Sequence, residues 1–247
     1  MRRKRKDWSR GDACAERSFI VGTAEAHLAD ARSFSFPTSC DVLVFDPPWD
    51  AEDLWNLKTP SFSSALVFCD GKYASRAIER FGAPWWIFVW DTMQTWSANK
   101  SQPLNGCKLC LLFGSQWNRD AALYGDAPPA KNHPSTVYTP ASGRRLSDLF
   151  RKSLRWQSNA NASGSSDRPP HTKPDEWVKA LVAGVAVKGG LVVDPFMGGG
   201  SSLLAANAAE MRCVATEIDQ DVFSWARKRL MQKPGEDRGL PLFMESA

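Results

Sequence analysis

The chain has 247 residues, of which 43% are hydrophobic and 23% are charged, with a formal net charge of +4. This length and composition are those of a globular protein with a sizeable core, which excludes a disulfide-stapled miniprotein, and the apolar runs are far shorter than the roughly 18 residues of a membrane span. The basic start is followed by no apolar signal segment, so we expect a cytoplasmic protein without membrane contact.

The first half of the chain begins with a basic tail and then alternates apolar and amphipathic segments. We expect residues 1–10 to be this tail and residues 11–247 to form one domain. In chain order, the patterns predict a strand at 18–21, a helix at 24–32, strands at 41–45 and 65–69, a helix at 73–81, and strands at 85–90 and 107–113. The strand at 41–45 ends abruptly in Asp46-Pro47-Pro48-Trp49.

The second half begins with an irregular stretch and then returns to regular alternation. Residues 117–170 are rich in Pro, Ser, Asn and Gly, and we interpret them as an insertion with one short basic helix at 146–156. Beyond it, the patterns predict a helix from Pro174 to Gly189-Gly190, a strand at 191–193, a helix at 202–209, a strand at 213–216 and a helix at 222–231. This alternation predicts an α/β fold, with a mostly parallel sheet covered by helices on both faces.

Two of the six cysteines, Cys107 and Cys110, are close enough in sequence to suggest a metal site. A zinc site needs further ligands at matching spacing, and the three histidines provide no second cluster. The run from Cys107 to Phe113 is apolar, and side chains three apart on a strand point to opposite faces. We therefore predict a buried strand here and no metal site.

Basic charge is concentrated in the irregular stretch. Between Trp117 and Pro174 there are nine lysines and arginines against four acids, and the chain contains 11 tryptophans. Cations neutralise phosphates while flat rings stack on bases, so this combination is typical of a nucleic-acid surface, although a solvated basic face is the simpler interpretation. The residues we assign to nucleic-acid binding are Arg144, Arg145, Arg151, Lys152 and Arg155.

A glycine-rich segment, Asp194-Pro195-Phe196-Met197-Gly198-Gly199-Gly200-Ser201-Ser202, lies where a predicted strand gives way to a helix. Its glycines permit close approach of a ligand to the backbone. Glu217 follows the next strand, where a carboxylate can accept hydrogen bonds from ribose hydroxyls. The segment lacks the Lys-Ser/Thr pair of a P-loop and the spacing of a dinucleotide site. We predict a ligand with a ribose and no pyrophosphate, such as S-adenosylmethionine.

These motifs together resemble the amino-methyltransferases of DNA. The glycine-rich segment is similar to their cofactor motif, Asp46-Pro47-Pro48-Trp49 to their catalytic motif, and Glu217-Ile218-Asp219 to their ribose-binding acid. The catalytic motif comes first, and a Lys-Pro pair at Lys173-Pro174 precedes the cofactor strand, as in the permuted β arrangement of this family. One departure is Gly22-Thr23, where the family commonly has Gly-Asp.

The resemblance implies a Rossmann-like fold with permuted motif order, S-adenosyl-L-methionine as cofactor, and an inserted target-recognition region at about 117–170. The catalytic residues that it implies are Asp46, Pro47, Pro48 and Trp49. The cofactor-binding residues that it implies are Lys173, Asp194, Phe196, Gly198, Gly200, Ser201, Ser202 and Glu217. The implied partner is double-stranded DNA, and a homodimer stays open.

The expected reaction is methyl transfer to an exocyclic amine. Such a nitrogen is a poor nucleophile, because its lone pair is delocalised into the ring; Asp46 and the Pro47 carbonyl could accept its two hydrogens, while Trp49 stacks on the extruded base. Asp with Trp is associated in this family with adenine, so we expect adenine N6. The alternatives are cytosine N4, adenosine in RNA, and a catalytically silent subunit of the same fold.

Overall fold

The computed structural model describes residues 17–48, 51–91, 107–114, 117–118, 173 and 175–231, and all structural statements below concern this part of the chain. Three of our predictions lie outside it: the basic tail at 1–10, the side chain of Trp49, and the basic helix at 146–156 with the five residues assigned to nucleic-acid binding.

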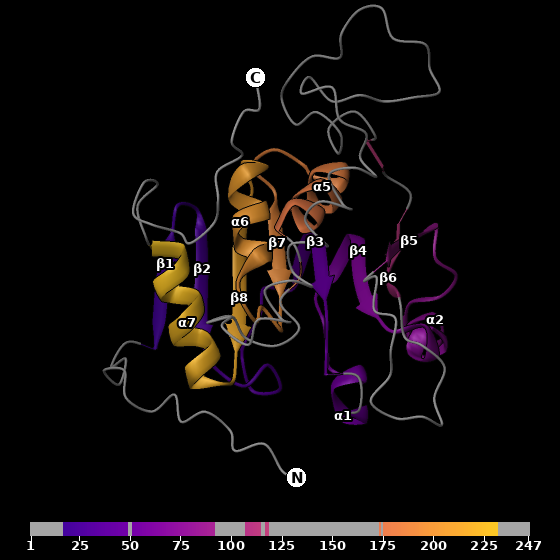
Figure 1. Ribbon diagram of the computed structural model, residues 1–247, viewed down its shortest axis with the longest axis horizontal. Coiled ribbons are helices and arrows are strands. Elements are labelled where there is room, and N and C mark those ends of the chain that lie inside the picture. The colour runs from indigo at the N-terminus through magenta and orange to yellow at the C-terminus, as the bar shows by residue number, and fades with distance from the viewer. Residues whose placement is uncertain are drawn as a thin grey trace, which may run out of the picture.

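Eight described strands form one sheet, in the order β1-β2-β8-β7-β3-β4-β6-β5 (Figure 1). The five central strands run parallel, while β1 pairs antiparallel with β2 at one edge, and β6 and β5 add antiparallel at the other. The mostly parallel sheet is thus confirmed for the centre. The strands are β1 (Ser18–Val21), β2 (Ala24–Leu28), β3 (Ser39–Phe45), β4 (Ser61–Cys69), β5 (Trp86–Asp91), β6 (Cys107–Phe113), β7 (Leu191–Asp194) and β8 (Arg212–Glu217).

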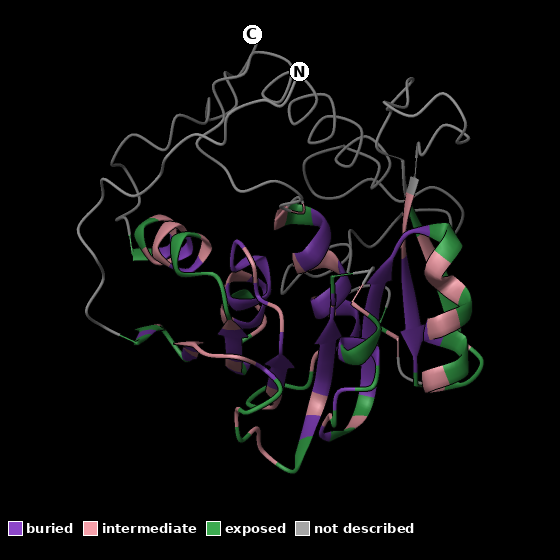
Figure 2. Ribbon diagram, turned by 90° about the horizontal axis from the view of Figure 1, so that it is seen from below, coloured by how far each residue is buried: buried purple, intermediate pink, exposed green. Residues whose placement is uncertain are grey.

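Helices pack on both faces of the sheet, as the alternation predicts. One face carries α5 (Asp175–Val185), α6 (Ser201–Ala208) and α7 (Gln220–Met231) over a core that includes Val42, Phe68 and Val192. The other face carries α1 (Glu52–Trp55), the 3-10 turn η1 (Gly71–Tyr73) and α2 (Ala74–Phe81) over Leu43 and Phe45. In the middle of the sheet, Val42–Phe45 of β3, Ser64–Cys69 of β4 and Val192–Asp194 of β7 are all buried (Figure 2). No described helix has the length and apolarity needed to cross a membrane.

The predicted helix at 24–32 is wrong. Residues Ala24–Leu28 form β2, which pairs antiparallel with β1 and parallel with β8. Ala24 and Ala26 are fully buried, whereas Glu25 and His27 are not, so burial alternates along the segment as on a strand. The helical composition of the segment, with its alanines and glutamate, is a weak preference that pairing on both sides overrides.

The predicted helix from Pro174 to Gly189 is shorter than expected. It ends at Val185, and Gly189, at φ 73°, occupies the turn that leads into β7. The N–H of Gly189 donates to the carbonyl of Glu210 at 2.9 Å. The remaining expected strands and helices outside the insertion occur within a few residues of their predicted bounds.

The connections leave a switch point in the middle of the sheet. From β3 the chain passes by way of α1 to β4 on one side, and from β7 it passes by way of α6 to β8 on the other. Ligands of α/β proteins bind in the crevice at such a point, outside the carboxyl ends of the strands. Asp46 directly follows β3 and Asp194 ends β7, so the fold brings the two sequence motifs to one crevice.

Candidate active site

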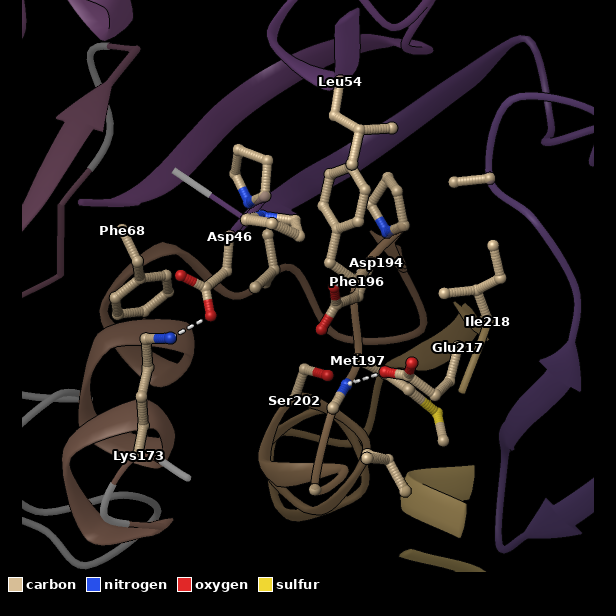
Figure 3. Close-up of a pocket in the computed structure, with 18 of the residues that line it drawn as sticks. Asp46, Leu54, Phe68, Lys173, Asp194, Phe196, Met197, Ser202, Glu217 and Ile218 are labelled. Carbon is tan, nitrogen blue, oxygen red and sulfur yellow. Dashed lines mark hydrogen bonds and ion pairs between the residues drawn. The ribbon is translucent and has the colours of Figure 1, made fainter. Parts of the chain in front are cut away.

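A cavity of about 860 Å³ lies at the carboxyl edge of the sheet. Residues that follow five different strands line it: Asp30 after β2, Glu217 at the end of β8, Asp194 at the end of β7, Asp46 after β3 and Cys69 at the end of β4. The volume is within the range of about 300–1,000 Å³ that is common for ligand pockets. The cavity therefore contains both the expected cofactor motif and the expected catalytic motif (Figure 3).

The glycine-rich segment forms a tight turn between β7 and α6. Gly198 and Gly200 have φ of 50° and 79°, in the left-handed region that residues with a Cβ rarely adopt. A Cβ on Gly200 would approach Leu230 Cδ1 to 2.6 Å. The turn thus requires glycine at these positions, and it brings the backbone of Gly198 and Gly199 to the cavity wall.

Asp194, the last residue of β7, binds the backbone at the start of the glycine-rich turn. It is buried, and its carboxylate accepts the N–H of Phe196 at 2.9 Å. Burial raises the pKa of the Asp194 carboxyl to about 7, because the charged form loses its water and the Ser202 hydroxyl and the Phe196 N–H compensate only in part. The Ser202 hydroxyl is also buried, lies next to the Asp194 carboxylate, favours its charged form, and lines the cavity.

Glu217 binds the same turn from the side of β8. Its Oε2 accepts the N–H of Gly198 at 3.0 Å, and its Oε1 accepts the N–H of Asp219 at 2.8 Å. Burial raises the pKa of the carboxyl, although these N–H groups act against the shift. Each carboxylate oxygen can accept more than one hydrogen bond, so Glu217 keeps capacity for ligand hydroxyls on the cavity side.

Asp46 lies on the opposite wall of the cavity and forms an ion pair with Lys173. The Lys173 ammonium contacts Oδ2 of Asp46 and lies 4.8 Å from the centre of the Phe68 ring. Figure 3 shows the Lys173 side chain reaching from the start of α5 to this carboxylate. Pro47 is buried and Pro48 is exposed, and both line the cavity.

A second polar cluster connects the helices behind the glycine-rich turn. Arg229 of α7 donates to the carbonyl of Gly199 and to Asp175, and the Ser201 hydroxyl donates to Asp175 Oδ1 at 2.7 Å. Burial acts to raise the pKa of Asp175, but the charge of Arg229 and its hydrogen bond outweigh this, and the pKa is lowered. The cluster holds α5, α6 and α7 around the turn.

Most of the residues assigned from sequence meet in this cavity. The described residues of the set that line it are Asp46, Pro47, Pro48, Lys173, Asp194, Phe196, Gly198, Ser201, Ser202 and Glu217. Gly200 does not line it; its backbone caps α6 and packs against Leu230. Trp49 lies outside the described residues.

The Gly22-Thr23 turn lies away from the cavity, at the amino end of β2. Its Thr23 hydroxyl donates to the carbonyl of Met211 at 2.7 Å, and its N–H donates to Asn207 Oδ1 at 3.0 Å. These contacts attach the β1–β2 hairpin to α6 and β8, so the departure from Gly-Asp at this point falls outside the cavity.

Sequence reasoning missed Asp30 and did not assign a role to Ile218. Asp30 lines the cavity beyond the end of β2, where the N–H of Ala29 donates to the carbonyl of Glu217 at 2.9 Å. The Arg32 N–H and guanidinium lower the pKa of its carboxyl. Ile218 is 62% exposed and lines the same end of the cavity. The available signal was an acidic residue, Asp30, shortly after a period-two pattern, and the wrong helix at 24–32 concealed it.

Comparison with solved structures shows the same fold. The chain is similar to the M1.HpyAVI–SAM complex, with 16% identity over 85% of this chain and 100% of that one and a TM-score of 0.54. It is also similar to PvuII DNA methyltransferase, described as cytosine-N4-specific, with 12% identity over 87% and 88% of the two chains and a TM-score of 0.56. A third similar structure is TTHA0409 of Thermus thermophilus, described as a putative DNA modification methylase, with 17% identity over 83% and 94% and a TM-score of 0.51.

Sequence comparison identifies the family. No curated protein matches the chain. The family model N6_N4_Mtase, described as DNA methylase, matches residues 62–228, which include the whole cofactor motif and Glu217. The matched segment ends one residue before Arg229 and covers more than half of the chain. The protein is a member of the N6/N4 family of DNA methyltransferases.

Proposed function

We propose that this protein transfers a methyl group from S-adenosylmethionine to the N6 amine of adenine in double-stranded DNA. The observation that carries the proposal is the single cavity in which the Asp46-Pro47-Pro48 motif faces the glycine-rich turn and Glu217. The choice of adenine depends on the pairing of Asp46 with Trp49 in the motif, which this family associates with adenine.

The residues of the cavity fit the cofactor. Glu217 has acceptor capacity for ribose hydroxyls, and the exposed Ile218 beside it offers an apolar surface for a purine ring. Asp30 lies at the same end of the cavity and can accept from an amine. The Ser202 hydroxyl and the backbone of Gly198 and Gly199 also line the cavity. When bound, S-adenosylmethionine supplies an electrophilic methyl group on its sulfonium centre.

The residues of the Asp46-Pro47-Pro48 motif activate the target amine, which is the nucleophile. The Asp46 carboxylate and the Pro47 carbonyl accept the two hydrogens of the target amine, which reduces the delocalisation of its lone pair into the ring. With S-adenosylmethionine bound, its methyl group would pass to the nitrogen and its sulfur would leave as a neutral thioether, and the Asp46 carboxylate is an acceptor for the proton that the methylated amine then loses. The contribution of the protein is to hold the amine in line and away from water.

The target base leaves the DNA helix before transfer. While the base is paired in the duplex, its exocyclic amine cannot reach the Asp46 carboxylate inside the cavity. Extrusion of the base from the duplex costs a few kcal/mol. We assign Trp49 to stacking on the extruded base. We assign the region at about 117–170, including Arg144, Arg145, Arg151, Lys152 and Arg155, to contacts with DNA phosphates.

The test is methylation of DNA that carries no methyl groups. Purified protein, S-adenosylmethionine and mixed-sequence duplex DNA are incubated, and the nucleosides are then separated by mass. We expect N6-methyladenosine in its deoxy form. Detection of N4-methyldeoxycytidine instead would show that the substrate is cytosine. Methyl transfer only in a parallel reaction with RNA would show that DNA is not the substrate. Binding of S-adenosylmethionine without any methyl transfer would identify a catalytically silent subunit.

A further inference from the structure

We propose that Lys173 is a positioning residue for the catalytic carboxylate: its ammonium holds Oδ2 of Asp46, so that Oδ1 is presented to the target amine. The inference rests on the proposed function, because Asp46 is taken as the acceptor of an amine hydrogen. It differs from the role in cofactor binding that the family resemblance implies for Lys173.

The contacts of Asp46 favour this role. Lys173 engages Oδ2, and within the described part of the chain no donor reaches Oδ1. The pair is largely shielded from water, since the exposed fractions of the Lys173 and Asp46 side chains are 15% and 26%. A carboxylate that rotates freely offers either oxygen in many directions, whereas one with Oδ2 held offers Oδ1 in a single direction.

The lysine side chain is itself held in place. Its ammonium lies over the face of the Phe68 ring, at 4.8 Å from the centre, which favours a cation at that point. Phe68 is buried at the end of β4, the strand next to β3. The ring and the carboxylate therefore fix the ammonium from two neighbouring strands.

The backbone of Lys173 is connected to the cofactor turn. Asp175, two residues further along, accepts from Ser201 at the start of α6 and from Arg229, and Arg229 also donates to the Gly199 carbonyl. The Ser201 hydroxyl also lies 3.4 Å from the Lys173 carbonyl, so the backbone of Lys173 and the start of α5 contact the end of the glycine-rich turn directly.

Lys173 also compensates negative charge in the cavity. Asp46 lies close enough to Asp194 and Cys69 for its charge to raise the pKa of both groups, and Lys173 acts in the opposite direction on Asp194. Negative charges gathered in a partly dry cavity destabilise one another. The Lys173 ammonium compensates the charge of Asp46 directly.

The test separates positioning from cofactor binding. The variants are Lys173→Met, Lys173→Arg and, as a matched control, Lys179→Met, whose lysine forms an exposed pair with Glu176 on the same helix. We measure the dissociation constant of S-adenosylmethionine by calorimetry, and the maximal rate of methyl transfer to unmethylated duplex DNA at saturating cofactor. We expect Lys173→Met to lower the maximal rate about 100-fold, as for a misplaced reacting group, with a cofactor affinity close to that of the wild type.

The conservative variant and the control complete the pattern. Lys173→Arg retains a cation and should recover part of the rate, and Lys179→Met should match the wild type in both measurements. A large loss of cofactor affinity in Lys173→Met with an unchanged maximal rate would make Lys173 a cofactor ligand and overturn the proposal. An unchanged rate and affinity would overturn it as well.

A measurement without catalysis keeps this inference separate from the proposed function. The free energies of unfolding in urea of the wild type, Asp46→Asn, Lys173→Met and the double variant form a double-mutant cycle. We expect the effects of the two changes to be less than additive, because each removes the same ion pair. Additive effects would overturn the pairing. Coupled free energies of unfolding together with no methyl transfer by the wild type would preserve the pairing and contradict the proposed function instead.

Discussion

Leu43 and Val193 are register partners in the neighbouring parallel strands β3 and β7. The pairing places the ends of these strands side by side, so that Asp46 and Asp194 meet at one crevice although the insertion separates them in sequence. The two motifs thereby form opposite walls of one site. A substitution in the wall of Asp46 should therefore affect methyl transfer, and one in the wall of the glycine-rich turn should affect cofactor binding.

The first prediction concerns this division. Asp46→Ala should abolish methyl transfer while leaving the affinity for S-adenosylmethionine within a few-fold of the wild type. Glu217→Ala should weaken cofactor binding by roughly 1.5–3 kcal/mol, the usual value for hydrogen bonds to a charged group. Calorimetric titration of both variants measures this, with Glu210→Gln, in an exposed ion pair with Lys188, as the control. Equal loss of affinity in the folded Asp46→Ala protein would contradict the division.

A second prediction concerns the turn at Gly200. Gly200→Ala places a methyl group 2.6 Å from Leu230 Cδ1 and forces alanine to φ 79°, whereas Gly189→Ala meets φ 73° with no atom within 4 Å. We expect Gly189→Ala to lower the free energy of unfolding by about 1–2 kcal/mol, the cost of the left-handed conformation, and Gly200→Ala to lower it further. Urea unfolding measures both, and equal destabilisation would show that the Leu230 contact relaxes without cost.

The third prediction follows from the pKa of Asp194. In the unfolded chain this carboxyl ionises near its ordinary value of 3.8, but in the folded protein it does so only at about 7. Between these values the folded state holds a proton that the unfolded state has lost, so the contribution of Asp194 to stability declines as pH rises and is constant above about 7. Compared with Asp194→Asn, the wild-type protein without cofactor should lose unfolding free energy from about pH 4 to about pH 7. Parallel curves for the two proteins would exclude this titration.

The fourth prediction tests stacking by Trp49. Trp49→Ala should lose activity on duplex DNA, and Trp49→Phe should retain part of it, because a ring is needed to stack on the extruded base. A fluorescent adenine analogue at the target position reports extrusion directly. If the two variants were equally active, another group would have to hold the base.

The fifth prediction addresses the basic stretch of the insertion. Each phosphate contact contributes about 0.9 to the slope of log affinity against log salt, so replacing Arg151, Lys152 and Arg155 by Gln should flatten the slope by up to about 2–3. The control replaces Lys188 and Arg212, which lie at the amino edge of the sheet, away from the cavity. Affinity over a salt series on duplex DNA measures the slope. An unchanged slope would remove the three residues from the DNA-binding surface, and relaxed sequence preference would indicate base readout.

The sequence by itself determined the elements whose pattern is local and the motifs whose chemistry is unusual. The apolar run at Val42–Phe45 is short and rich in β-branched and aromatic residues, which favours a buried strand, and Pro47-Pro48 marks its end. Gly198 and Gly200 marked a turn in the left-handed region that residues with a Cβ rarely adopt. The α/β class, the order of the two motifs and the part of the cavity wall that these motifs form followed from such features.

Other features depended on residues far apart in the chain, and only the tertiary structure decided them. Ala24–Leu28 became a strand because β1 and β8 pair with it on either side, and this brought Asp30 to the cavity. The ion pair between Lys173 and Asp46 depends on the packing of α5 against β4, which no local pattern encodes. Intrinsic preferences amount to a few tenths of a kcal/mol per residue, whereas pairing and burial in a sheet exceed them, so long-range contacts decide wherever the local signal is weak.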